Sequence, residues 1–116
     1  MSTTSESYDR AVRAKEEGRY SEAITELEAV LGEDPANPDV HWQMGLVLCF
    51  MGDFDGSLAE LQKAVDLDSG HIPARNDLAM THMMLGNYEE AKSIFLTVLA
   101  DDPGNEVATR QLVYFS

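Results

Sequence analysis

Three glycines recur at one fixed spacing, and this periodicity constrains the fold more than any other feature of the sequence. Gly18, Gly52 and Gly86 lie 34 residues apart, and an aromatic residue follows each of them two positions later. The same offset aligns residues of like character in all three copies: Ala23, Ser57 and Ala91; Leu27, Leu61 and Phe95; Leu31, Val65 and Leu99; Asp34, Asp68 and Asp102. A run of matches held at one spacing indicates three tandem repeats.

Each repeat carries the start and stop signals of two helices. In the second repeat, Asn37 and Pro38 provide an N-cap and a first-turn proline, and Gly52 suits the left-handed conformation that ends a helix. Asp53 is then expected to be the N-cap of the following helix. The corresponding residues of the third repeat are Pro73, Gly86 and Asn87. The first repeat is the exception, because Arg19 stands at its second cap position.

Between these signals, the apolar and small residues follow a helical spacing. The first helix of the second repeat carries them at i, i+3, i+4 and i+7: His41, Met44, Gly45 and Leu48. Its second helix does the same with Phe54, Leu58, Leu61 and Val65. Neither helix could bury such a stripe alone, so stacked helical hairpins sharing one continuous core are expected.

Short motifs at the glycine positions give the repeat a family resemblance. Residues 18–23 read Gly-Arg-Tyr-Ser-Glu-Ala, residues 52–54 read Gly-Asp-Phe, and residues 86–91 read Gly-Asn-Tyr-Glu-Glu-Ala. Together with the 34-residue period and the closing Asp-Pro pairs, these motifs resemble the tetratricopeptide repeat over roughly residues 4–105. The sequence departs from the family pattern in the first helices: at Ser7, His41 and Arg75, and at Ala14, Leu48 and His82.

The resemblance implies an all-α, right-handed α-solenoid of three helix-turn-helix hairpins. The repeats would occupy residues 5–105, at about 4–37, 38–71 and 72–105, after a flexible N-terminus at residues 1–4. Residues 106–116 are expected to form a short capping helix, in which Val107, Leu112 and Phe115 could cover the last hairpin. Family members mostly bind peptides or proteins in a concave groove lined by the first helices, so the same function is expected here.

The first helix of the second repeat has a second apolar face, which predicts where such a groove would lie. Trp42, Leu46, Cys49 and Phe50 fall at i, i+4, i+7 and i+8 on this helix. Shifting by the repeat period adds these positions: Tyr8, Val12, Asn76, Met80, Met83 and Met84. These side chains could be additional core, or they could form an adaptable apolar site for a helix or an extended peptide. The second interpretation suits the set as a whole better.

Some tetratricopeptide domains hold the C-terminal carboxylate of heat-shock chaperones with lysine, arginine and asparagine side chains on these inward positions. The matching positions here carry Tyr8, Val12, Trp42, Gln43, Asn76 and Met80. Because Asn76 alone could serve in such a clamp, the sequence argues against it. Asn76 is left with two interpretations, a hydrogen bond to a ligand backbone or a solvated or locally capping side chain.

Charge and composition restrict the partners. The net charge of -13, from 21 acidic and 8 basic residues, would repel nucleic acid and anionic lipid and would suit a partner with basic flanking residues. Most of the acidic residues are expected on a solvated outer face. No apolar stretch is long enough to span a membrane, so insertion is not expected. A single cysteine and an N-terminus without secretory features favour the cytoplasm.

No constellation of residues predicts catalysis, a metal site or a cofactor. The histidines are scattered at positions 41, 71 and 82, and Cys49 has no cationic neighbour in sequence that would activate it. Two functions remain. The chain would be an adaptor or chaperone-like module that binds an apolar or amphipathic peptide segment, or a self-assembling scaffold that uses the same groove or the Phe115 end as a homo-oligomer interface.

Overall fold

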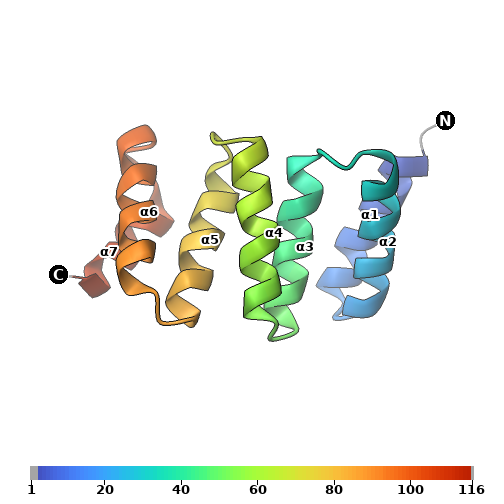
Figure 1. Cartoon of the computed structure of the whole chain (residues 1–116), viewed down its shortest axis with the longest axis horizontal. Coiled ribbons are helices and arrows are strands. Elements are labelled where there is room, and N and C mark those ends of the chain that lie inside the picture. Colours follow the sequence, from blue (N-terminus) through green and yellow to red (C-terminus); the bar gives the residue numbers. More distant parts are fainter. Residues whose placement is uncertain (1–2, 116) are drawn as a thin grey trace.

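The computed structural model describes residues 3–115, which form seven α-helices and a short 3-10 helix (Figure 1). The α-helices are α1 (Thr3–Glu16), α2 (Tyr20–Glu33), α3 (Pro38–Phe50), α4 (Phe54–Leu67), α5 (Ile72–Met84), α6 (Tyr88–Asp101) and α7 (Glu106–Leu112). The 3-10 helix η1 (Val113–Phe115) follows directly. The prediction of an all-α repeat fold is confirmed.

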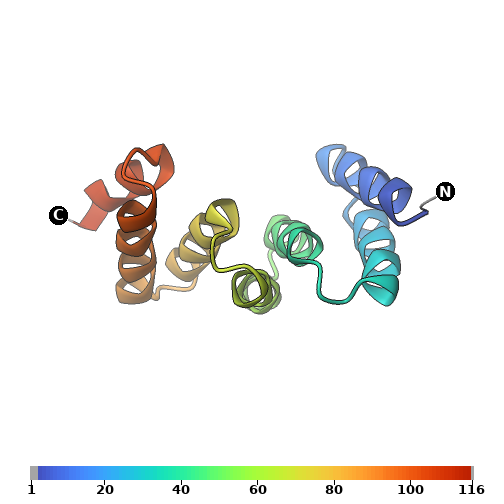
Figure 2. The same cartoon turned by 90° about the horizontal axis from the view of Figure 1, so that it is seen from above.

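The helices form an elongated array of 48 × 26 × 20 Å in which each helix packs against its neighbours in sequence. The pairs α1/α2, α3/α4 and α5/α6 are antiparallel hairpins that follow one another along the long axis (Figure 1). Seen from above, the first helix of each hairpin lies on one side and the second helix on the other, with α7 continuing the row of first helices (Figure 2). The array is curved, so the first helices share an inner face.

The turn inside each hairpin depends on a glycine in the left-handed region. Gly18, Gly52 and Gly86 have φ angles of 79°, 83° and 82°, which a side chain would disfavour. Each turn is closed by backbone hydrogen bonds; in the second hairpin, the amide of Asp53 donates to the carbonyl of Leu48 at 2.9 Å. The expected role of the three glycines is confirmed.

Helix capping differs between the repeats more than the sequence indicates. Asn37 Oδ1 accepts from the amides of Asp39 and Val40 at 3.0 and 3.3 Å, and Asp53 Oδ1 accepts from Gly56 at 2.9 Å, as predicted. The side chains of Arg19 and Asn87 make no cap hydrogen bond. For Asn87 this corrects the prediction: its Nδ2 lies 3.2 Å from Nδ1 of His82, one turn back in α5. The other helix of this hairpin, α5, is capped by the ring of His71, which accepts from the amide of Ala74.

Within residues 3–115, the buried apolar residues between the two rows of helices form two clusters, so the single continuous core expected from the sequence is not seen. One cluster joins the first hairpin to α3: Ala11, Ala14, Ala23, Leu27, Val30, Val40, Met44 and Val47. A second joins the third hairpin to α7: Ala79, Ala91, Phe95, Val98 and Ala108. In the middle hairpin, Gly45 lies so close to α4 that an added Cβ would stand 2.6 Å from Cγ of Leu61, which is fully buried.

Polar side chains at the positions that depart from the family pattern also join paired helices. His41 is buried, and its ring nitrogens lie 2.8 Å from Oε1 of Glu60 and 2.8 Å from the carbonyl oxygen of Pro35. Arg75 is buried as well and donates from Nη1 to Oδ2 of Asp101 at 2.7 Å. Because both groups have partners, the departures add links inside the hairpins rather than leaving gaps.

The C-terminal segment covers the third hairpin in part. Leu112 and Phe115 pack against the second core cluster, whereas Val113 and Tyr114 are 66% and 74% exposed. At the other end, residues 1 and 2 of the expected flexible N-terminus lie outside the described residues, and α1 begins at Thr3. Between residues 3 and 115, none of the helices has the length and apolar character needed to cross a bilayer.

The close approach at Gly45 predicts an unusual response to substitution. Gly45→Ala should lower the free energy of unfolding, because the strain of overpacking costs about 1–3 kcal/mol and exceeds the helix-propensity gain of about 1 kcal/mol. Gly32→Ala is the matched control: Gly32 lies in α2 with open space at its Cβ position, and this change should stabilise the protein. Urea denaturation measures both, and a stabilising effect of Gly45→Ala would show that the hairpin contact is looser than described.

The capping difference gives a second test. Asn37→Ala should reduce the free energy of unfolding by about 1 kcal/mol because two amides of α3 lose their acceptor. Asn87→Ala, the same change at a helix start without a cap hydrogen bond, should cost less than about half of that. Thermal and urea unfolding of the two variants side by side would check this, and equal losses would contradict it.

Candidate binding groove

All ten side chains expected to line a groove lie on the first helices α1, α3 and α5. They lie in different environments. Tyr8 and Val12 are half-buried on α1, at the N-terminal end of the array. Met83 is turned toward the core of the third hairpin, where it packs with the cluster of Ala79 and Phe95. Five residues gather between α3 and α5: Leu46, Cys49, Phe50, Met80 and Met84. Trp42 lies beside them, whereas Asn76 contacts the start of α7.

A pocket of about 240 Å³ opens between α3 and α5, and is called here the α3/α5 pocket. It is lined by Leu46, Cys49, Phe50, Leu61, Asp77, Met80, Thr81 and Met84. Five of these residues belong to the set expected from the sequence. Three large apolar side chains at the pocket are open to solvent: Phe50 is 58%, Met80 is 37% and Met84 is 61% exposed. The rings of Phe50 and Tyr20 stack at 5.9 Å, which ties the pocket to the first hairpin.

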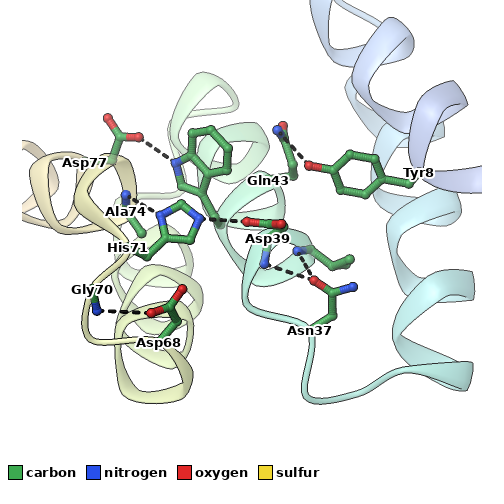
Figure 3. Close-up of polar contacts among 11 residues, drawn as sticks. Tyr8, Asn37, Asp39, Gln43, Asp68, Gly70, His71, Ala74 and Asp77 are labelled. Atoms are coloured by element: carbon green, nitrogen blue, oxygen red, sulfur yellow. Dashed lines mark hydrogen bonds and ion pairs between the residues drawn. The ribbon is translucent and has the colours of Figure 1, made fainter. Parts of the chain in front are cut away.

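Trp42 lies beside the pocket and is held from two sides by the third hairpin. Its Nε1 donates to Oδ2 of Asp77 at 2.8 Å, and its ring centroid lies 5.0 Å from that of His71 (Figure 3). The ring of His71 is itself fixed, because Nδ1 accepts from the amide of Ala74 at 3.1 Å. Nε2 must then carry the proton and donate to Oδ1 of Asp39 at 2.8 Å. These contacts join the second and third hairpins beside the pocket.

A second polar group joins the first and second hairpins on the same face. Gln43 is buried and donates from Nε2 to the hydroxyl oxygen of Tyr8 at 3.3 Å (Figure 3). Its Oε1 accepts from Nζ of Lys15 at 2.8 Å. Partial burial raises the pKa of the Tyr8 hydroxyl, so it stays protonated at neutral pH. Tyr8 is therefore a structural contact between hairpins as well as a surface residue.

Asn76 is not the solvated or locally capping side chain that was one of its two expected interpretations. It is only 5% exposed, and its Nδ2 donates to Oδ1 of Asn105 at 3.1 Å. Asn105 is the N-cap of α7 and also accepts from the amide of Ala108 at 2.9 Å. Asn76 is therefore neither solvated nor a cap of its own helix, and it links α5 to the start of α7. Among the described residues, its Oδ1 is buried without a hydrogen-bond partner.

Asp77 is the charged residue of the α3/α5 pocket, and its place there was not predicted from the sequence. Burial raises the pKa of its carboxyl group, while the hydrogen bond from Trp42 and the more distant charge of Lys15 oppose the shift. Burial, with the charge of Asp77, also raises the pKa of the Cys49 thiol. A signal was present in the sequence, since Asp77 stands one repeat period after Gln43, a position already recognised as inward-facing.

These features define the class of the protein: a helical-repeat module for protein–protein interaction, with an inner face built from the first helix of each hairpin. The sequence model of the tetratricopeptide repeat matches residues 14–61 and 50–112, which together make up most of the chain. The chain belongs to the tetratricopeptide repeat family.

Solved structures of tetratricopeptide domains have the same fold. The first domain of Spaghetti (RPAP3), bound to the HSP90 peptide SRMEEVD, has a TM-score of 0.90 and 23% identity, with 96% of this chain and 88% of that chain covered. The second domain of human RPAP3, in complex with the HSP70 peptide SGPTIEEVD, has a TM-score of 0.86 and 26% identity, with 93% and 90% covered. The likeness to the first of these concerns the fold alone.

One curated relative is similar over a shorter stretch. The DnaJ protein P58IPK homolog of Arabidopsis thaliana is 27% identical over 90 residues, which make up 78% of this chain. The chain spans only 19% of that protein's length, so the similarity concerns one part of a larger molecule. Within residues 3–115, no group of three or more histidine, cysteine, aspartate and glutamate side chains is placed to hold a metal ion.

The environment of Asp77 predicts how stability depends on pH. The pKa of the Asp77 carboxyl group is higher in the folded protein than in the unfolded chain, where it is about 3.9. As pH rises above that value, the unfolded chain loses the carboxyl proton first. Ionisation of Asp77 therefore lowers the stability of the folded protein. Asp77→Asn removes this cost and keeps an oxygen that can accept from Trp42. The stability of the variant relative to wild type should therefore increase between pH 3 and pH 7. Urea denaturation followed by Trp42 fluorescence tests this, and a constant difference would contradict it.

Proposed function

We propose that this chain binds a partner protein by taking apolar side chains of an exposed segment into the α3/α5 pocket. The observation that carries the proposal is the exposure of Phe50, Met80 and Met84 around a recess whose other lining is largely apolar. Large apolar side chains gathered on one surface mark interaction sites. The segment would be amphipathic or apolar, as expected from the sequence.

The side chains at this pocket can adapt to partner segments of different shape. Methionine is unbranched and polarisable, so Met80 and Met84 can adapt to different apolar shapes. Trp42, in contrast, is held in place by Asp77 and His71, so little ordering cost remains to be met on binding. Burying about 400 Å² of apolar area would contribute about 10 kcal/mol before the costs of association. An affinity of about micromolar is expected after those costs.

Acidic C-terminal peptides of the kind bound by the two RPAP3 domains are a poor match for this inner face. Both peptides end in Glu-Glu-Val-Asp. Here the pocket presents Asp77, the ammonium group of Lys15 is hydrogen-bonded to Gln43, and Asn76 is buried. An incoming carboxylate would meet a negative charge where a clamp needs cationic donors. We therefore place the specificity of this chain with apolar rather than with acidic segments.

A second candidate function is self-association through the C-terminal end. Val113 and Tyr114 are 66% and 74% exposed on η1, beside α7, whereas Phe115, which the sequence analysis favoured, packs partly against the core. Sedimentation over a concentration series tests this directly. A scaffold should show a concentration-dependent rise in mass that Tyr114→Ser abolishes, and a protein that stays monomeric would exclude this function.

The expectations from the sequence about catalysis, charged partners and cell compartment also form part of this proposal. A binding module of this kind needs no catalytic group or cofactor, and the net charge of -13 disfavours nucleic acid as a partner. The same charge would speed encounter with a partner that has basic flanking residues. The cytoplasm is kept as the proposed compartment because a reducing environment suits the single free thiol of Cys49.

A charge placed in the pocket should test the proposed function. Met84→Glu should weaken capture of an apolar or amphipathic peptide at least tenfold, because a carboxylate would be desolvated against the bound segment. Leu96→Glu is the matched control, since Leu96 is 52% exposed on α6, outside the pocket. Titration calorimetry with an amphipathic Leu/Gln peptide measures both, with circular dichroism as the check on folding. Equal losses in the two variants would refute the proposed site.

A further inference from the structure

Asp77 is the one ionisable carboxylate among the residues that line the α3/α5 pocket. The other polar side chains of its lining are the thiol of Cys49 and the hydroxyl of Thr81. The hydroxyl is already engaged, because it donates to the backbone carbonyl of Asp77 at 2.9 Å. A segment that fills the pocket therefore meets mainly apolar surface and lies close to one carboxylate group.

The charge of Asp77 is only partly compensated inside the protein. Among residues 3–115, its carboxylate accepts one hydrogen bond, from Nε1 of Trp42 to Oδ2. The two nearby cationic or potentially cationic groups are directed elsewhere: Lys15 donates to Gln43, and His71 donates to Asp39. Burial consequently raises the pKa of Asp77 despite these groups. A carboxylate in this situation gains more from an added cation than one on an open surface does.

The surroundings also favour a cation over an anion or a neutral donor. The protein carries a net charge of -13, so a basic segment would be attracted from a distance and an acidic one repelled. Close to the site, Asp39 lies next to His71 and adds to the negative potential of the inner face. Charge complementarity thus acts both at long range and at the pocket itself.

We propose that the partner segment presents an apolar side chain to the α3/α5 pocket and a lysine or arginine beside it that pairs with the carboxylate of Asp77. The proposal rests on the proposed function and specifies its ligand. The apolar group fills the space bounded by Leu46, Met80 and Met84, and the basic group reaches the pocket wall at α5. The cation would pair with the oxygen of Asp77 that does not accept from Trp42, so that Trp42 stays in place.

The test uses three synthetic amphipathic peptides that differ only in the residue beside the leucine face: lysine, glutamine or glutamate. Titration calorimetry would measure each against wild type, against Asp77→Asn and against Glu28→Gln. The last variant removes one negative charge from an exposed position on α2, outside the pocket. Alkylation of Cys49, which lines the pocket, would report whether a bound peptide covers it.

Wild type should bind the lysine peptide about tenfold more tightly than the glutamine peptide, as expected for a partly desolvated charge-assisted contact. Asp77→Asn should remove that difference between the lysine and glutamine peptides. Glu28→Gln should change little, and its effect should vanish at about 0.5 M salt, where exposed charges are screened. Bound lysine peptide should slow the alkylation of Cys49.

Three results would overturn the proposal, and they are distinguishable from failure of the proposed function. If the glutamine peptide binds wild type as tightly as the lysine peptide, the apolar site stands and the cation is not recognised. If Asp77→Asn weakens all three peptides alike, Asp77 acts only by holding Trp42. If the protein forms a dimer that the lysine peptide dissociates, the occupant of the pocket is a second copy. Absence of binding by any peptide would refute the proposed function as well.

Discussion

Inside each hairpin, the two helices approach each other where the first helix carries a small residue. Ala11, Gly45 and Ala79 occupy this position in the three repeats, and each is buried against the second helix of its pair. At Gly45 the approach is so close that no Cβ fits beside Leu61. Because small residues let the backbones come together, the larger apolar side chains of the first helices are directed to the neighbouring hairpin or to the inner face.

The α3/α5 pocket is a product of this arrangement and belongs to two repeats jointly. Phe50 comes from the end of α3, Met80 and Met84 from α5, and Leu61 forms the floor from α4. The hydrogen bond between Trp42 and Asp77 joins the two hairpins beside it, in addition to the packing of α4 against α5. The shape of the pocket therefore depends on the junction between repeats, and a change at that junction would alter binding without touching the ligand.

Much of the fold follows from the sequence because the determining interactions are local. The 34-residue period, the glycines in the hairpin turns and the caps at Asn37 and Asp53 each depend on a few neighbouring residues. The cap expected at Asn87 was wrong: its side chain contacts His82 and makes no cap hydrogen bond. Comparison between repeats predicts least where equivalent positions hold different residue types, as at Tyr8, Trp42 and Asn76.

The candidate site was harder to predict from the sequence than the fold was, because it depends on which side chains of different helices contact one another. The apolar set placed five residues at the pocket, but it did not include Asp77, whose partner Trp42 lies 35 residues earlier in the chain. The hydrogen bond of Asn76 was not predicted for a similar reason, since its partner Asn105 lies at the start of α7. Apolar spacing alone does not reveal polar contacts of this kind between successive repeats.

The contacts of this array are confined to neighbouring elements, and this has a consequence for how the chain folds. Each helix packs mainly against the helices immediately before and after it, so few contacts require the closure of long loops. Folding can begin at any hairpin and spread outward. The middle hairpin, with side-chain caps on both helices, is best suited to form first. The first hairpin, whose second helix starts at the uncapped Arg19, should exchange its amide protons with solvent soonest.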